Sequence, residues 1–395
     1  MTAMRKLRPP RLTAKPIRSA EPIIFLVVFL GIFCAIGSRM GAVNMLGTMM
    51  ETAYELLLDT VFYIMAVAVL AGALSALLSE FGVIAMVNKL LSPLMKPLYG
   101  LPGAASLGIV TTYLSDNPAI LALANDKSFR RYFKKYQLPA LTNIGTAFGM
   151  GAIVTTFMIG LVSPTGESFV KAALIGNVGA FIGSIVSTRL MLRHTAKLYG
   201  KEEPCDGSES GPEMATEHRA VREGSIGMRL IDAIMDGGKT GVALGLDIIP
   251  GVLIICTIVL MLTNGPSETG AYTGAAYEGV AFFPWLGQKL SFILQPLFGF
   301  TSNEAIAVPI TALGSAGAAI GLVPKLVSSG SATGCDVAVF TAMCMCWSGY
   351  LSTHVAMMNN LKHGKLIGRA IASHTIGGLC AGVAAHWLFR LVSLL

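Results

Sequence analysis

Charged residues are scarce in this chain. They make up 13% of its 395 residues, whereas hydrophobic residues make up 53%. Soluble domains average about 25% charged residues, so the composition excludes a soluble enzyme or a soluble binding module. Apolar runs that reach or approach the roughly 20 residues needed to cross a bilayer recur along the chain. The composition therefore predicts an all-α polytopic membrane protein whose permanent partner is the lipid bilayer.

Motifs of enzyme chemistry are also missing. The sequence contains no Gly-x4-Gly-Lys-Ser/Thr loop, no Gly-x-Ser-x-Gly elbow and no His-Glu-x-x-His pair, which would indicate nucleotide, acyl-transfer or zinc chemistry. Its seven cysteines include no Cys-x-x-Cys pair, and Cys344 and Cys346 lie in an apolar segment, where cysteine packs as a small hydrophobe. We therefore expect no enzymatic activity, no bound metal and no cofactor, with Na⁺ or H⁺ left open as coupling ions.

Basic residues gather in short stretches between the apolar runs, where they orient a membrane protein. The first twenty residues contain no acid and carry Arg5, Lys6, Arg8, Arg11, Lys15 and Arg18. We therefore predict a cytoplasmic N-terminus at a bacterial inner (plasma) membrane. We expect no nucleic-acid partner despite the net charge of +7. The apolar stretch 23–36 continues into a multi-span chain without a small-residue cleavage site, so we expect no signal peptide.

The hydropathy pattern predicts about eleven apolar segments. They cover residues 22–40, 60–79, 83–99, 103–124, 138–162, 170–192, 241–262, 281–299, 303–326, 336–358 and 366–393. Segments 83–99 and 281–299 contain prolines and polar residues, so whether each spans or re-enters the membrane stays open. If both re-enter, the bases at 126–136 no longer fall on the cytoplasmic side.

We divide the chain at its composition changes. The units are a basic tail (1–21), an N-terminal transmembrane helix with an outer connector (22–58), a first repeat (59–192), a polar cytoplasmic linker (193–227) and a second repeat (228–395). The linker is rich in polar residues and is expected to be flexible. An amphipathic surface helix over 225–240 is predicted to lead into the second repeat.

The two halves resemble each other at a constant shift of 199 residues. Identical residues that pair without a gap include Thr112 with Thr311, Thr142 with Thr341, and Met158 with Met357. The bases at 126–136 predict a cytoplasmic loop, whereas the equivalent stretch 327–335 has none and suits the outer face. This opposition predicts two inverted five-segment repeats with broken or re-entrant helices after one N-terminal helix, a plan common among secondary transporters. The alternative is chance similarity between apolar segments.

A polar break interrupts the segment 103–124. Ser115, Asp116 and Asn117 precede Pro118, which removes a backbone donor and ends a helix. A carboxylate and unwound carbonyls at membrane depth would hold Na⁺, a proton or a polar solute. Alternatively, Asp116 caps the helix that starts at Pro118, and the two roles are compatible.

Other candidate ligands lie further along the chain. Asn303 and Glu304 begin a predicted half-helix whose N-terminal amides would bind an anionic or polar group, with a plain capping box as the alternative. Ser315 lies between glycines that allow a bend. Polar residues within the remaining segments are Thr142, Asn143, Asn177, Ser348 and His354. Such residues also hydrogen-bond between membrane helices without any transport role, so both interpretations stay open.

Two phrases carry a family resemblance. The stretch from Leu91 to Gly103, followed by residues 115–119, resembles the nucleoside-recognition or Gate domain, and residues 290–299 resemble it again. Such domains occur in spore-maturation-type membrane proteins, ferrous-iron transport proteins and concentrative nucleoside transporters. The two-copy layout looks like spore maturation proteins A and B fused. The chain departs from that pattern at Asp116 and at 347–354, where a site would lie.

Together these features predict a secondary transporter of the inner membrane for a small polar solute. The resemblance implies a nucleoside-like solute, ion coupling, and alternating access between the repeats. The alternative is a non-transporting membrane scaffold or assembly factor whose polar groups serve helix packing. A homo-oligomer is compatible with either function.

Overall fold

The computed structural model describes residues 20–115, 117–125, 127–130, 132–205, 222–267 and 269–394. Within these residues the chain is almost entirely helical and has no β-strand. Six helical stretches of the described chain are long and apolar enough to cross a membrane. Together with the composition, this confirms the predicted all-α polytopic membrane protein. Residues 1–19 of the basic tail and residues 206–221 of the polar linker lie outside the described residues.

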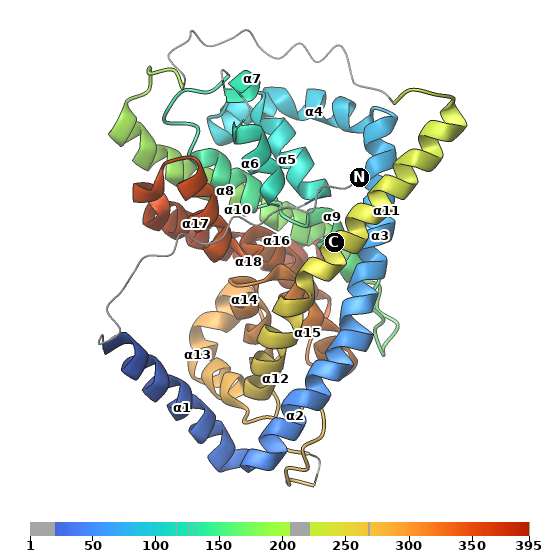
Figure 1. The fold of residues 1–395 in the computed structure, drawn as a ribbon, viewed down its shortest axis with the longest axis vertical. Helices are drawn as coiled ribbons and strands as arrows, with labels where there is room; N and C mark the ends of the chain where they lie inside the picture. Colours follow the sequence, from blue (N-terminus) through green and yellow to red (C-terminus); the bar gives the residue numbers. More distant parts are fainter. Residues whose placement is uncertain are drawn as a thin grey trace.

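The six membrane-length stretches are the long elements of Figure 1. They are α1 (Ala20–Met40); α2 (Ala42–Glu55), η1 (Leu56–Val61) and α3 (Phe62–Glu80) in one rod; α8 (Ala140–Thr146) with α9 (Gly151–Ile159); α10 (Val170–Tyr199); α11 (Ile226–Pro250), η3 (Gly251–Cys256) and α12 (Thr257–Thr263) in a second rod; and η5 (Gly364–Leu366) with α18 (Ile367–Ser393). The predicted surface helix over 225–240 is therefore not a separate element, because it continues into the second rod.

The remaining helices are shorter. They are α4 (Val83–Leu94) with η2 (Met95–Tyr99), α5 (Ala105–Leu114), α6 (Pro118–Asn125), α7 (Lys127–Arg130), α13 (Phe282–Phe298), η4 (Asn303–Ile306), α14 (Ala307–Ala312), α15 (Ala316–Ser328), α16 (Gly334–Trp347) and α17 (Tyr350–Asn360). All eleven predicted apolar segments correspond to helices. The outer connector predicted over 41–58 is helical too, because it forms α2 and most of η1.

The segments 83–99 and 281–299 do not belong to the membrane-length set. In Figure 1, α4 lies across the end of α3 instead of running beside it. Met86, Leu90 and Leu94 are exposed at intervals of four residues, so they share one apolar face of α4. An amphipathic helix in this position is suited to the membrane interface.

The segments 103–124 and 303–326 each form a helical hairpin, whereas the sequence predicts only an interruption of the helix. A Cβ atom on Gly108 of α5 would overlap the Ile120 side chain of α6. Twelve residues along a continuous helix would be separated by about 18 Å, so α5 and α6 form a hairpin. The second segment repeats this arrangement, because α14 packs against α15. Both segments enter and leave on one side of the molecule, which corrects the expectation that they cross.

The repeats are inverted. Adding 199 to the bounds of α9 gives 350–358, which is within α17, and adding 199 to the bounds of α10 gives 369–398, which largely overlaps α18. The counterparts α10 and α18 run antiparallel, because Gly179 packs against Ala381 while Gly183 packs against Gly377. The rod that contains α3 and the rod that contains α11 also run antiparallel (Figure 1). Antiparallel counterparts are what an inverted repeat requires.

Ion pairs and hydrogen bonds assign the loops to two faces. Lys134 pairs with Glu202 and Lys135 pairs with Glu203, each at 2.7 Å, and Tyr199 meets His363 at 3.1 Å. We call residues 127–130, 132–139, 200–205 and 361–366 the basic face. At the opposite end, Lys171 donates to the Ser393 hydroxyl at 3.1 Å. The basic face is the predicted cytoplasmic side, and its orientation in a cell stays a prediction.

The basic face contains a pH-sensitive residue. Burial, and then the positive charges of Arg130 and Lys135, hold the pKa of His363 below its ordinary value. An unfolded histidine takes up a proton near pH 6.5, whereas folded His363 resists until lower pH. The unfolded state therefore binds more protons as pH falls, and stability is lost in that direction. We expect the melting temperature to drop between pH 7.5 and 5.5, and to drop less in His363→Gln. Equal slopes in thermal-shift scans of both proteins would contradict this.

Candidate functional site

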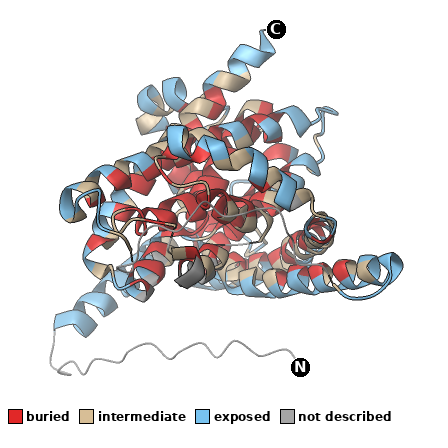
Figure 2. Ribbon diagram, turned by 90° about the horizontal axis from the view of Figure 1, so that it is seen from above, coloured by how far each residue is buried: buried red, intermediate tan, exposed pale blue. Residues whose placement is uncertain are grey.

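Four helix interruptions meet in the middle of the molecule. They are the turn between α5 and α6, the turn at 147–150 between α8 and α9, the turn at 313–315 between α14 and α15, and the turn at 348–349 between α16 and α17. Buried residues concentrate in this central region (Figure 2). Two of the interruptions come from each repeat.

Direct contacts join these interruptions. The Asn117 side-chain amide donates to the Ser348 carbonyl at 2.8 Å, and a Cβ atom on Gly149 would lie 2.7 Å from the Ser348 hydroxyl. The Gly349 amide donates to the Ala312 carbonyl at 3.1 Å, and its Cβ position is 3.1 Å from the Gly314 carbonyl oxygen. We call Asn117, Gly149, Gly314, Ser348 and Gly349 the crossing point.

The local sequence explains why the helices stop here. Pro118 begins α6 and cannot continue a preceding helix. Gly349 has a φ of 64°, in the left-handed region that only glycine adopts without strain. Met150 has a φ of 56° and is held there without that freedom. Each interruption leaves backbone amides and carbonyls outside helical hydrogen bonding, which is the usual means of building a solute or ion site at membrane depth.

The structure places part of the predicted first-repeat site at the crossing point. Asn117 and Ser348 are both buried there. Ser115 is half-exposed, and its hydroxyl donates to the Thr111 carbonyl at 2.6 Å. Asp116 lies outside the described residues, so its predicted role as a ligand stays a prediction. The predicted helix start at Pro118 is confirmed.

Next to the crossing point lies a buried polar network that joins the repeats. The Asn143 amide donates to the Ser187 hydroxyl at 2.9 Å and to the Ala370 carbonyl at 3.1 Å. Ser187 in turn meets Nδ1 of His374 at 2.8 Å, and Nε2 of that ring meets the Cys346 carbonyl. Asn143 therefore holds α8, α10 and α18 together. Thr142 lies beside it and donates to the Pro139 carbonyl at 2.8 Å.

His354 stands at the edge of this network. It is fully buried, and its ring centroid is 4.7 Å from that of His374. Nδ1 is 3.0 Å from the Tyr350 carbonyl, which can only accept, so Nδ1 carries the proton and Nε2 presents a lone pair. No described residue donates to that Nε2. His354 is thus a buried acceptor beside a second imidazole.

The other predicted residues lie elsewhere. Asn177 accepts from the Tyr113 hydroxyl and donates to Thr155, both at 2.9 Å, in a separate contact between α5, α9 and α10. Asn303 is exposed and Glu304 is half-exposed. Both lie in η4, at the start of the α14–α15 hairpin and away from its tip at 313–315. The capping box proposed there is wrong, because Ser302 makes no capping hydrogen bond. A capping box forms instead between Thr333 and Asp336.

Ser315 has a structural role. It is the N-cap of α15, and its hydroxyl accepts from the Ala318 amide at 3.2 Å. It adjoins the crossing point, because a Cβ atom on Gly349 would lie 3.8 Å from its Cα atom. Its hydroxyl is therefore committed to the hairpin tip that carries Gly314.

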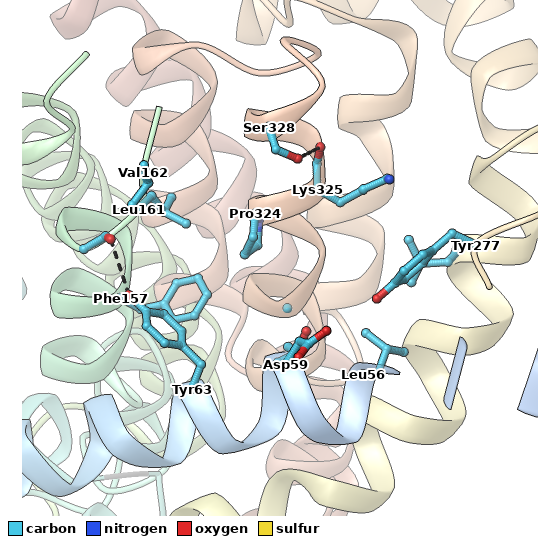
Figure 3. Close-up of a pocket in the computed structure, with 14 residues that line it drawn as sticks. Leu56, Asp59, Tyr63, Phe157, Leu161, Val162, Tyr277, Pro324, Lys325 and Ser328 are labelled. Carbon is cyan, nitrogen blue, oxygen red and sulfur yellow. Dashed lines mark hydrogen bonds between the residues drawn. The ribbon is translucent and has the colours of Figure 1, made fainter. Parts of the chain in front are cut away.

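A pocket missed by the sequence analysis opens between the repeats. It has a volume of about 430 Å³ and is lined by Asp59, Tyr63, Phe157, Tyr277 and Lys325, among others (Figure 3). The predicted segment 60–79 began one residue after Asp59, which left this acid at the edge of the first repeat and outside its first apolar segment. The stretch 48–71 contains no glycine or proline, and that signal would have extended the helix through Asp59.

Comparison with known proteins gives a likeness of fold. No family model and no curated protein matches the sequence. Solved structures of CNTnw do match. A doubly substituted form in an outward-facing state has a TM-score of 0.51 and 13% sequence identity, and the match covers 94% of this chain and 85% of that one. An inward-facing substrate-bound state has a TM-score of 0.51 and 14% identity, with 93% and 83% covered, and a singly substituted form in an intermediate state has a TM-score of 0.51 and 15% identity, with 93% and 85% covered.

At such identity the match shows the fold alone. It supports one part of the predicted resemblance, the concentrative nucleoside transporters, and none of the comparisons supports the Gate-domain or spore-maturation part. The chain has the architecture of a concentrative nucleoside transporter at the level of a distant structural neighbour.

Proposed function

We propose that this protein is a secondary transporter that moves a small polar solute across the membrane by alternating access. The observation that carries the proposal is the crossing point, where two interruptions from each inverted repeat meet within a buried core. Interrupted helices turn backbone amides and carbonyls toward partners outside their own helix at membrane depth, and broken helices of this kind form the solute and ion sites of many transporters.

The location between repeats supports alternating access. Asn117 belongs to the first repeat and Ser348 to the second, and one hydrogen bond of 2.8 Å joins them. A solute held between two such halves becomes accessible from either side when one half moves against the other. The structural neighbours adopt outward-facing, inward-facing and intermediate states, which agrees with such a movement.

We further propose a nucleoside-like solute and coupling to Na⁺ or H⁺. The structural neighbours suggest the solute class, since one of them is a substrate-bound nucleoside transporter. Asp116, between Ser115 and Asn117, supplies a carboxylate for a cation, and the buried acceptor on His354 is an alternative proton site. The basic face would be cytoplasmic, with the N-terminus on the same side of a bacterial inner membrane.

A stability screen tests the solute. The purified protein is heated with nucleosides, nucleobases, amino acids, dipeptides or dicarboxylates, with and without Na⁺. A ligand present at a hundred times its Kd stabilises the folded state by about 2.7 kcal/mol. We expect a nucleoside to raise the melting temperature of the parent. Asn117→Ala should melt lower without ligand, since it loses the hydrogen bond to Ser348, and should show no rise when the nucleoside is added. Ser291→Ala, on the exposed face of α13, serves as the control.

Uptake into proteoliposomes then separates transport from binding. We expect accumulation of the hit compound driven by an inward Na⁺ or H⁺ gradient and abolished in Asn117→Ala. A screen without hits in both salts, or uptake that is unchanged in the variant, would contradict the proposal and favour the scaffold alternative.

A further inference from the structure

The pocket beside Asp59 has the features of a second binding site, away from the crossing point. Its volume of about 430 Å³ is within the roughly 300–1,000 Å³ typical of small-molecule sites. The first rod forms its floor with Asp59 and Tyr63, α9 contributes Phe157, and α15 contributes Lys325 (Figure 3). Tyr277, from the loop before α13, closes the far wall. The pocket thus joins both repeats.

Asp59 is the unpaired charge of this pocket. Its carboxylate points into the cavity from the floor (Figure 3). Within the described residues, Asp59 is exposed and takes part in no ion pair. Lys325 shares the pocket, but its ammonium lies over the Tyr277 ring at 5.3 Å from the centroid and not on the acid. A carboxylate in a mainly apolar cavity attracts a cation from solution.

Aromatic rings surround this carboxylate. Tyr63 and Phe157 stand edge to face, with centroids 5.6 Å apart, and the Tyr63 hydroxyl donates to the Gly160 carbonyl at 3.3 Å, which fixes the ring. Aromatic faces attract ammonium groups through their quadrupole and also bind an apolar body. An acid flanked by rings is therefore complementary to a cation that carries apolar groups.

The backbone of Tyr277 is fixed at the wall of the pocket. Its φ of 65° is unusual for a residue with a side chain, and its amide donates to the Thr52 hydroxyl at 2.9 Å. Burial, and then the carboxylates of Glu55 and Asp59, raise the pKa of Tyr277 to about 12. The Tyr277 hydroxyl therefore stays protonated and neutral at physiological pH.

We propose that this pocket binds a small organic ammonium ion, with the ammonium on Asp59 and the apolar body against Tyr63, Phe157 and Tyr277. The same chemistry is offered by a soluble amine and by the ammonium headgroup of a membrane lipid. The proposal does not rest on the transport function, because it concerns a site that the crossing point does not share.

The test measures equilibrium binding of 2-phenylethylammonium to the purified full-length protein in detergent, with 2-phenylethanol as the neutral counterpart. We expect the ammonium to bind and the alcohol to bind at least about tenfold more weakly, which reflects one partly desolvated charge pair. Asp59→Asn should lose about the same factor. Asp247→Asn, an exposed acid on α11 outside the pocket, should bind like the parent.

Substitutions at two further positions keep the proposal falsifiable if Asp59→Asn fails to fold. Lys325→Gln removes a competing positive charge, so binding should tighten by about threefold, the opposite sign to Asp59→Asn. Tyr63→Leu should weaken binding, whereas Tyr63→Phe, which keeps the ring, should not. Equal binding of the alcohol, or parent-like affinity in both Asp59→Asn and Lys325→Gln, would overturn the proposal.

Nanodiscs distinguish the two sources of the ammonium. The same titration is repeated in discs of phosphatidylglycerol mixed with diacylglycerol, neither of which carries an ammonium group, and in discs of phosphatidylglycerol mixed with the same share of phosphatidylethanolamine. A weaker apparent affinity in the second set assigns the site to the lipid headgroup, and equal affinity assigns it to a soluble amine.

Discussion

Gly149→Ala is expected to abolish solute binding at the crossing point. Its Cβ atom would overlap the Asn117 side-chain oxygen and lie 2.7 Å from the Ser348 hydroxyl, so it would push apart one contact from each repeat. Overfilling a packed site costs about 1–3 kcal/mol. If the bound state bears all of this cost, affinity falls about 5- to 150-fold. Binding and proteoliposome uptake of the solute found in the screen measure the effect.

The control for this variant is another helical glycine with free space. A Cβ atom on Gly368 would meet no atom within 4 Å, so Gly368→Ala should bind and transport normally. Parent-like uptake by Gly149→Ala would show that the crossing point tolerates an added methyl group and is not the solute site. A lower melting temperature with unchanged affinity would show that Gly149 serves packing alone.

The number and order of the helices could be predicted from the sequence, because apolar run length is a local property. The direction of the chain after each break could not. Pro118 ends a helix, but only the fit of Ile120 between the glycines at 108 and 145 folds α6 back along α5. This contact joins residues that are far apart in the chain, so a hydropathy pattern cannot predict it.

The predicted side of the basic loop is unaffected by these two segments, because their effects on the path of the chain cancel. The sequence leaves open whether 83–99 spans, and the structure places it across the end of α3 (Figure 1), which removes one crossing. The hairpin over 103–124 removes another. Lys134 and Lys135 therefore lie on the side where the charge pattern placed them, together with Glu202 and Glu203. The expectation that re-entry of both 83–99 and 281–299 would upset this pattern took 103–124 as a crossing, and the hairpin of α5 and α6 removes that premise.

Only part of the candidate site could be predicted, because a sequence shows which residues are polar but not which residues pack together. Asn117 and Ser348 stand out as polar residues within apolar segments, and both reach the crossing point. Gly149 and Gly349 did not stand out, because glycine carries no chemistry of its own and its importance depends on what lies against it. Asp59 was missed because a segment boundary fell one residue too late.

Gly237→Ala is expected to destabilise the protein strongly while Gly238→Ala does not. In the seam between α3 and α11, a Cβ atom on Gly237 would overlap the Gly72 carbonyl and lie 2.8 Å from the Ala76 methyl group. A Cβ atom on Gly238 would meet Val69 at 3.6 Å, an ordinary contact. The first change should lower the free energy of unfolding by about 1–3 kcal/mol. The second should be neutral or raise it by up to about 1 kcal/mol, because alanine favours helix.

These two glycines form a matched pair, because they are adjacent in one helix and the substitution is the same. Any gain from helix propensity is shared, so a difference between their melting temperatures reports packing alone. Small residues at a membrane-helix contact let the backbones approach closely, and Gly241 against Ala68 continues the same seam. Equal melting temperatures would show that the rods are held by their ends, where Glu80 pairs with Arg229 at 2.7 Å. A large difference would establish the antiparallel glycine seam as the contact that holds the two repeats together.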